Sequence, residues 1–174
     1  MNMKNLLKIS SALAIITGVV FIIGGVWAIY FTYINVSQEK IVTPADAAIP
    51  NKLVSGPLTL KAQSDIIREH TLKMTGGKTY AEMPRQVEKL DENQNVVIDT
   101  EGKPVMVNNT ARDIWVTATA LTTALHLGII TYAFSGFIIL FGLISFWTGI
   151  TFRIIYKKYE NQSEEVLINL INKA

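Results

Sequence analysis

The chain has 174 residues, of which 49% are hydrophobic and 17% charged, with a net charge of +2. This bias is rare in a soluble domain of such size, and the small, scattered positive charge gives no basis for binding nucleic acid. Because the chain contains no cysteine, disulfides, thiol chemistry and cysteine-ligated metal sites are excluded.

The first apolar run predicts a membrane-spanning helix at residues 9–36, after a cytoplasmic N-terminus at residues 1–8. The run contains no Asp, Glu, Lys or Arg and exceeds the roughly 20 residues that cross a bilayer. Trp27, Tyr30 and Tyr33 lie at its outer end, where amphipathic rings favour the headgroup level. A cleaved signal peptide is the alternative, but the nearest small-x-small pattern, Ala45 to Ala47, lies too far beyond the run.

Residues 37–109 are expected to form an extracytoplasmic segment that is mostly helical. A helix is predicted from about residue 60 to 75, because apolar residues recur there at three- and four-residue steps and Gly76 and Gly77 supply a stop. Its predicted apolar face consists of Ala62, Ile66, Ile67, His70 and Met74. Residues 85–94 are predicted to be a solvated stretch, and residues 96–108 a β-hairpin that turns around Gly102.

A second long helix is predicted at residues 110–152, with the membrane-spanning part at about 127–150. Residues 114–152 again lack Asp, Glu, Lys and Arg. The first turns of this helix carry an apolar side that can dock the helix containing Ile66. Residues 153–174 are predicted to be a cytoplasmic tail with a short amphipathic helix, whose apolar face would be Val166, Leu167, Leu170 and Ile171.

The distribution of charge predicts the orientation of both spans. Lys4 and Lys8 precede the first span and Arg153, Lys157 and Lys158 follow the second, whereas charges between the spans are nearly balanced. Basic residues flanking membrane helices mark the cytoplasmic side. We therefore expect a protein of the cell inner (plasma) membrane, with both termini cytoplasmic and the central segment outside.

Two rows of small residues at seven-residue steps predict that the spans pair. A seven-residue step is close to two helical turns, so each row lies on one face where another helix can approach closely. In an antiparallel pair, equal depth means that position numbers have a constant sum, and both rows satisfy this condition. The rows are Ser11, Gly18, Gly25 and Thr32, facing Gly149, Gly142, Ser135 and Gly128. Small residues are also simply frequent in membrane helices, which is the alternative explanation.

The predicted fold class is therefore a mainly α membrane protein. It consists of an antiparallel two-helix transmembrane hairpin with a small, mostly helical extracytoplasmic cap and a possible β-hairpin insertion.

Few residues suggest chemistry. The chain has two histidines, His70 and His126, and neither has metal-ligand spacing. No Ser-His-Asp or paired-carboxylate arrangement can be defended, so no catalytic residue, metal or cofactor is predicted. His70, Trp115 and His126 remain candidates for a ligand site, if the helix near residue 66 docks against the one that follows residue 110.

An ordered set of short motifs resembles a family of small two-pass actinobacterial membrane proteins, many of which are labelled as aromatic ring-opening dioxygenases. The set is Gly56-Pro57, Ala62-Gln63, Ile67, His70, Leu72, Thr75-Gly76 and Thr79-Tyr80-Ala81-Glu82. The resemblance implies two spans around an outward segment, and the label looks like an annotation error. This chain departs from the family in an insertion at residues 84–108, and the family has no established activity to carry over.

These observations lead to three functional expectations. The first is a non-enzymatic accessory or stabilising subunit of a larger membrane or envelope complex, with the bilayer and a protein as its partners. The alternative is an extracytoplasmic protein that binds a lipid or another hydrophobic ligand near His70, Trp115 and His126. A metal-dependent oxygenase is the third and least supported.

Overall fold

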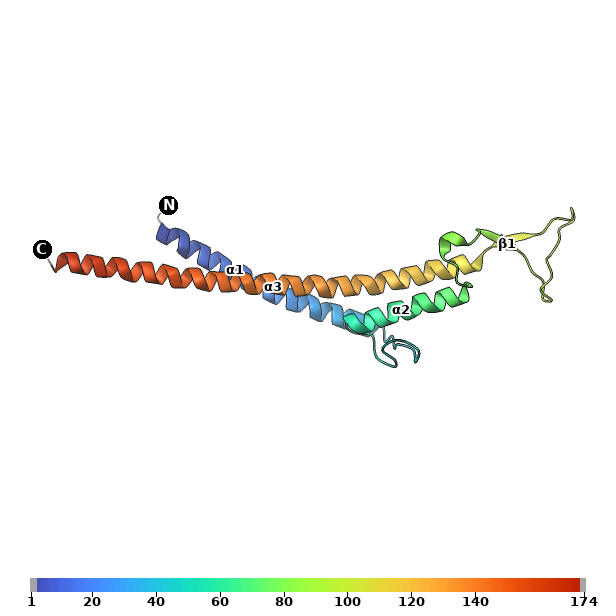
Figure 1. Cartoon of the computed structure of the whole chain (residues 1–174), viewed down its shortest axis with the longest axis horizontal. Helices are drawn as coiled ribbons and strands as arrows, with labels where there is room; N and C mark the ends of the chain where they lie inside the picture. Colours follow the sequence, from blue (N-terminus) through green and yellow to red (C-terminus); the bar gives the residue numbers. More distant parts are fainter. Residues whose placement is uncertain (1–2, 173–174) are drawn as a thin grey trace. The chain divides into compact units, whose positions relative to one another are not determined.

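The computed structural model describes residues 3–172, apart from the side chains of residues 164, 166, 167 and 170. It is mainly helical, with long helices α1 (Met3–Gln38) and α3 (Thr110–Ile171), a helix α2 (Pro57–Met74) and a small two-stranded antiparallel sheet (Figure 1). Both α1 and α3 are long and apolar enough to cross a membrane. The expectation of two long apolar helices is confirmed at this level. The predicted tail helix rests on Val166, Leu167 and Leu170, whose side chains lie outside the described residues.

The chain divides into two compact units. The first, called the hairpin unit, contains residues up to 35 and from 130 onward, and the second, called the central unit, contains residues 36–129. In the hairpin unit, α1 lies beside the later part of α3 (Figure 1). The buried residues of α1 are Ser11, Gly18, Gly25 and Thr32. On α3 the buried positions in this unit include Ser135, Gly142 and Gly149.

The two helices of the hairpin unit approach so closely that several of their glycines have no room for a side chain. A methyl group added at Gly18 would lie 2.6 Å from the Phe146 nitrogen and 2.8 Å from the Gly142 carbonyl oxygen. One added at Gly149 would lie 2.8 Å from the Ile15 nitrogen. In lipid, such backbone proximity is how helices gain dispersion contacts, because the surrounding chains are as apolar as leucine.

Two hydroxyl groups add hydrogen bonds across this interface. The Ser11 hydroxyl donates to the Gly149 carbonyl oxygen at 2.9 Å, and the Ser145 hydroxyl donates to the Ala14 carbonyl oxygen at 2.9 Å. Each bond joins a side chain to the opposite backbone. Because such bonds are directional, they define the relative register of the helices as well as stabilising the pair.

The other small residues of the two rows have different surroundings. A methyl group added at Gly25 would lie 3.0 Å from the Ser135 carbonyl oxygen. The Thr32 hydroxyl donates to the Ala28 carbonyl within its own helix. Gly128 belongs to the central unit, where it lies against the Leu60 side chain, 3.1 Å from an added methyl group.

The central unit begins with a tight loop between α1 and α2. Thr43 is 1% exposed, and its backbone nitrogen donates to the Lys52 carbonyl at 2.9 Å. The Lys52 nitrogen donates in return to the Thr43 hydroxyl at 3.0 Å. An isolated bridge between Val42 and Leu53 closes the loop. This loop places Asp46 near α2.

Helix α2 has signals at both ends in the sequence. Pro57 occupies its first turn, and the Thr59 hydroxyl accepts hydrogen bonds from the backbone nitrogens of Ser55 and Gly56 at 3.0 and 3.1 Å. At the other end Gly76 and Gly77 have φ values of +63° and +78°, which glycine adopts at little cost. The helix therefore begins three residues before the predicted position 60 and ends one before the predicted position 75.

The segment between α2 and α3 differs from the prediction. After a short 3-10 helix at Tyr80–Glu82, strand β1 (Gln86–Glu88) pairs antiparallel with β2 (Met106–Asn108). Residues 85–94 are thus not merely a solvated stretch. Residues 96–108 turn back around Gly102 as predicted, with an antiparallel bridge between Ile98 and Pro104, although residues 96–100 do not form a regular strand. Strand β1 is held by backbone hydrogen bonds, and Val87 is its only apolar residue. The apolar alternation that usually reveals a strand is therefore missing from the sequence.

Two similar turns separate the extended pieces of this segment. Asp91 and Asp99 each use a carboxylate oxygen to accept hydrogen bonds from the backbone nitrogens two and four residues later, at 2.8 to 2.9 Å. Gln94 and Gly102, each three residues after the Asp, have positive φ values of 62° and 78°. The second of these turns is the one expected around Gly102. The first turn, eight residues earlier, is built around Asp91 in the same way, but it has Gln94 where the second turn has Gly102.

Candidate functional site

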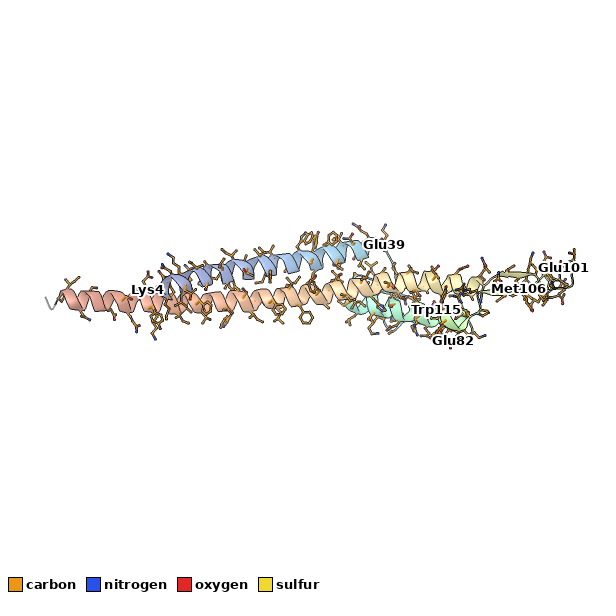
Figure 2. The ribbon with its side chains drawn as sticks, turned by 90° about the horizontal axis from the view of Figure 1, so that it is seen from above. Lys4, Glu39, Glu82, Glu101, Met106 and Trp115 are labelled. Atoms are coloured by element: carbon orange, nitrogen blue, oxygen red, sulfur yellow. The ribbon has the colours of Figure 1, made fainter. Side chains whose placement is uncertain are left out.

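Trp115 anchors the central unit. Its side chain is 7% exposed, and its indole nitrogen donates to the Lys78 carbonyl oxygen at 2.8 Å and to the Thr75 hydroxyl at 3.2 Å. In Figure 2 the labelled Trp115 lies where α3 runs beside α2. These bonds satisfy the indole donor and tie the end of α2 to α3, so Trp115 acts in packing.

The two histidines each bind a different partner. His126 Nε2 lies 2.9 Å from the Ser64 hydroxyl of α2. His70 Nε2 lies 2.8 Å from a carboxylate oxygen of Asp46 in the preceding loop, and both side chains are partly exposed. The hydrogen bond from His70 holds the pKa of Asp46 below its ordinary value of 3.8.

The structure does not gather the three candidate residues into one site. On α3, Trp115 and His126 are eleven residues apart, which is about 16 Å along the helix axis. His70 has its own partner, Asp46, rather than either of them. Within residues 3–172, no group of three or more His, Cys, Asp or Glu side chains could hold a metal ion.

A groove between α2 and the first turns of α3 is lined by one of the three candidate residues, His70. It encloses about 610 Å³ and is mostly apolar. Its lining comprises Ile67, His70, Thr71, Met74, Thr110, Asp113, Ile114, Thr117, Ala118 and Leu121. His70 therefore faces a cavity, whereas Trp115 and His126 are not among the residues that line it.

The groove exists because the apolar face of α2 is only partly used for packing. Ala62 and Ile66 are buried as expected, but Met74 is 62% exposed and His70 is partly exposed, so the predicted face is wrong at its C-terminal end. Ser64 and Thr71 are buried against α3 instead, at 2% exposure each. Thr71 can be buried without leaving its hydroxyl unpaired, because the hydroxyl donates to the Ile67 carbonyl of its own helix.

Arg112 joins the start of α3 to the segment that follows α2. Its guanidinium donates to the Met83 carbonyl oxygen at 2.6 Å and lies 3.8 Å from the centre of the Tyr80 ring. This combined hydrogen bond and cation–π contact was missed in the sequence. No local pattern in the sequence indicates it, because Arg112 and Tyr80 are 32 residues apart.

No protein-family model, curated protein or solved structure matches this chain.

Proposed function

We propose that this protein is a two-pass protein of the plasma membrane, and that it acts as an accessory or stabilising subunit of a larger membrane or envelope complex. The observation that carries the proposal is the amount of apolar side chain that the hairpin unit leaves exposed. Ile23 is 64% exposed on α1, and Phe134 and Trp147 are 64% and 73% exposed on α3.

Exposure on this scale is unusual for a protein surrounded by water. Monomeric soluble proteins rarely present a contiguous apolar patch of more than a few hundred Å². Side chains project along the lengths of both helices in Figure 2, and large apolar ones are exposed throughout the hairpin unit. Lipid chains or the helices of a partner would cover them. Either environment is compatible with a helix, because the backbone N–H and C=O groups are hydrogen-bonded within the helix itself.

The flanking charges support an orientation with both termini in the cytoplasm. Lys8 and Arg153 lie at the matching ends of the two apolar stretches, and basic flanks favour the cytoplasmic side. The central unit would then be outside. Its small buried core and its exposed apolar side chains, such as Leu58 at 74%, support a role in contacting another protein.

Three experiments test this proposal. Extraction of membranes with alkaline carbonate should leave the protein in the bilayer, and its release would contradict the two-pass arrangement.

The orientation is tested with single cysteines introduced at Gln94 and at Gln162, since the chain has none of its own. A membrane-impermeant maleimide should label Gln94→Cys on intact cells and Gln162→Cys only after permeabilisation. Purification in mild detergent should then recover a stoichiometric protein partner.

The groove beside His70 favours a second candidate function, the binding of a lipid or another hydrophobic molecule. Its volume of about 610 Å³ and mostly apolar lining are typical of small-molecule sites. In this case mass spectrometry of the purified protein should find a retained lipid and no protein partner. Thr117→Trp would fill the groove and release that lipid, whereas Thr119→Trp, two residues along α3 and outside the lining, should not.

A further inference from the structure

A second recess, in the hairpin unit, is lined by cations. It lies where the basic residues at the start of α1 meet those that follow the apolar part of α3, and it encloses about 250 Å³. Its lining comprises Lys8, Ser11, Ala12, Ile15, Arg153, Tyr156 and Lys157. We propose that this recess, called the basic pocket, binds the phosphate of an anionic phospholipid headgroup; the inference rests on the proposed membrane location.

The charge of the basic pocket is uncompensated within its own lining. Lys8, Arg153 and Lys157 contribute three positive charges, and the described part of the chain shows no ion pair for any of them. Three cations around one small recess repel each other until an anion is bound. Arg and Lys are the residues that bind phosphate oxygens, Arg through a planar fork and Lys as a point charge.

The remaining lining distinguishes a lipid from a free anion. Ala12 and Ile15 are apolar and follow Lys8 along α1, so the recess passes from charged to apolar within two helical turns. This is the order of headgroup and acyl chain in a phospholipid. Pockets that enclose a whole small molecule measure roughly 300–1,000 Å³. At about 250 Å³, this recess suits a headgroup whose chains extend along the helices.

One carboxylate is connected to the pocket. The Tyr156 hydroxyl donates to Glu160 at 2.7 Å, one turn further along α3. The hydroxyl is therefore already engaged, and the negative charge of Glu160 opposes an incoming phosphate. Glu160→Gln should accordingly strengthen binding, a result that a purely structural role of the cations would not produce.

The test compares two matched charge removals in the full-length protein purified in neutral detergent. Lys8→Gln with Lys157→Gln removes two charges from the basic pocket. Lys4→Gln with Lys158→Gln removes two from the same helix regions but outside the pocket lining. Phosphatidylglycerol or phosphatidylcholine with the same acyl chains is added, and bound lipids are counted by native mass spectrometry. Because one Lys or Arg near an anionic lipid changes affinity about fivefold, the pocket variant should lose on the order of 20-fold.

The expected result is a preference for phosphatidylglycerol that the pocket variant loses and the control variant keeps. A variant with Lys8→Arg and Lys157→Arg should retain it, because it keeps both positive charges. Equal losses in both glutamine variants, or equal binding of the two lipids, would overturn the inference. Displacement of the lipid by an equimolar amount of inorganic phosphate would overturn the assignment to a lipid.

Failure of this inference is separable from failure of the proposed function. A protein that resists alkaline carbonate but does not distinguish the two lipids retains its two-pass arrangement and lacks the site. A protein that alkaline carbonate releases contradicts both.

Discussion

The substitution Gly18→Leu should separate α1 from α3 in the hairpin unit. The first added carbon would lie 2.6 Å from the Phe146 nitrogen, 2.7 Å from the Phe146 Cβ and 2.8 Å from the Gly142 carbonyl oxygen. Two of these three atoms belong to the backbone and cannot rotate away. Heavy atoms prefer separations of about 3.5–4.0 Å, so the helices must move apart by about 1 Å before the rest of the leucine is placed.

The free-energy cost follows from this displacement. Overpacking an ordered interface costs about 1–3 kcal/mol, and a clash with backbone belongs at the upper end of that range. A cost of about 2–3 kcal/mol changes the ratio of paired to separated helices by roughly 30- to 150-fold. The loss of contacts around Gly142 would accompany it, because close backbone packing supplies the dispersion contacts between these helices.

Gly24→Leu is the matched control. It makes the same chemical change on the same helix, but no atom lies within 4 Å of a methyl group added at Gly24. Cysteines at Ala14 and Ser145 report pairing, since the Ser145 hydroxyl and Ala14 carbonyl oxygen lie 2.9 Å apart. A short thiol-specific crosslinker should join them in the parent and in Gly24→Leu, and much less in Gly18→Leu. Equal crosslinking of both leucine variants would refute the close-packing argument.

Three further predictions concern the central unit. Trp115→Phe removes the donor to the Lys78 carbonyl and should destabilise this unit by about 1–3 kcal/mol in thermal unfolding, whereas Trp147→Phe, at a position 73% exposed, should have little effect. The pKa of Asp46 lies below its ordinary value of 3.8 because of its hydrogen bond with His70, so this contact stabilises the fold above about pH 4 and is lost as pH falls through the lowered pKa. Hydrogen exchange of residues 43–54 should therefore become faster in that pH range, and Asp46→Asn should abolish the increase. In the turns before α3, Gln94→Gly should stabilise its turn by about 1 kcal/mol and Gly102→Val should destabilise its turn by a similar amount, because both positions have positive φ. Proteolysis of the turn should therefore be slower in the first variant and faster in the second, and the opposite pair of results would contradict the turn conformation.

Local signals explain why most of the helical structure could be predicted. The absence of Asp, Glu, Lys and Arg from residues 9–36 and 114–152 requires only a count, and it identifies the two long apolar helices. Pro57 and the glycines at 76 and 77 mark the ends of α2 within three residues. Each of these signals involves neighbours in sequence, so no tertiary contact is needed to interpret it.

The candidate site was less predictable. His70, Trp115 and His126 were grouped because the helices that carry them were expected to dock. Docking brings each of the three to a different hydrogen-bond partner, and only His70 lines the groove. Which partner a polar side chain finds depends on distances of a few tenths of an ångström between elements, and periodicity along the chain contains no such information.

The sequence by itself therefore determined the helical class, the apolar character of α1 and α3, and the positions where small side chains permit close approach. Only the tertiary structure decided that β1 pairs with β2, that Ser64 and Thr71 are buried while Met74 is exposed, and that Lys8 and Lys157 line one pocket. The physical reason is the range of the interactions. Propensity, capping and hydropathy act within one or two helical turns, whereas strand pairing and pocket formation depend on residues that are far apart in the chain.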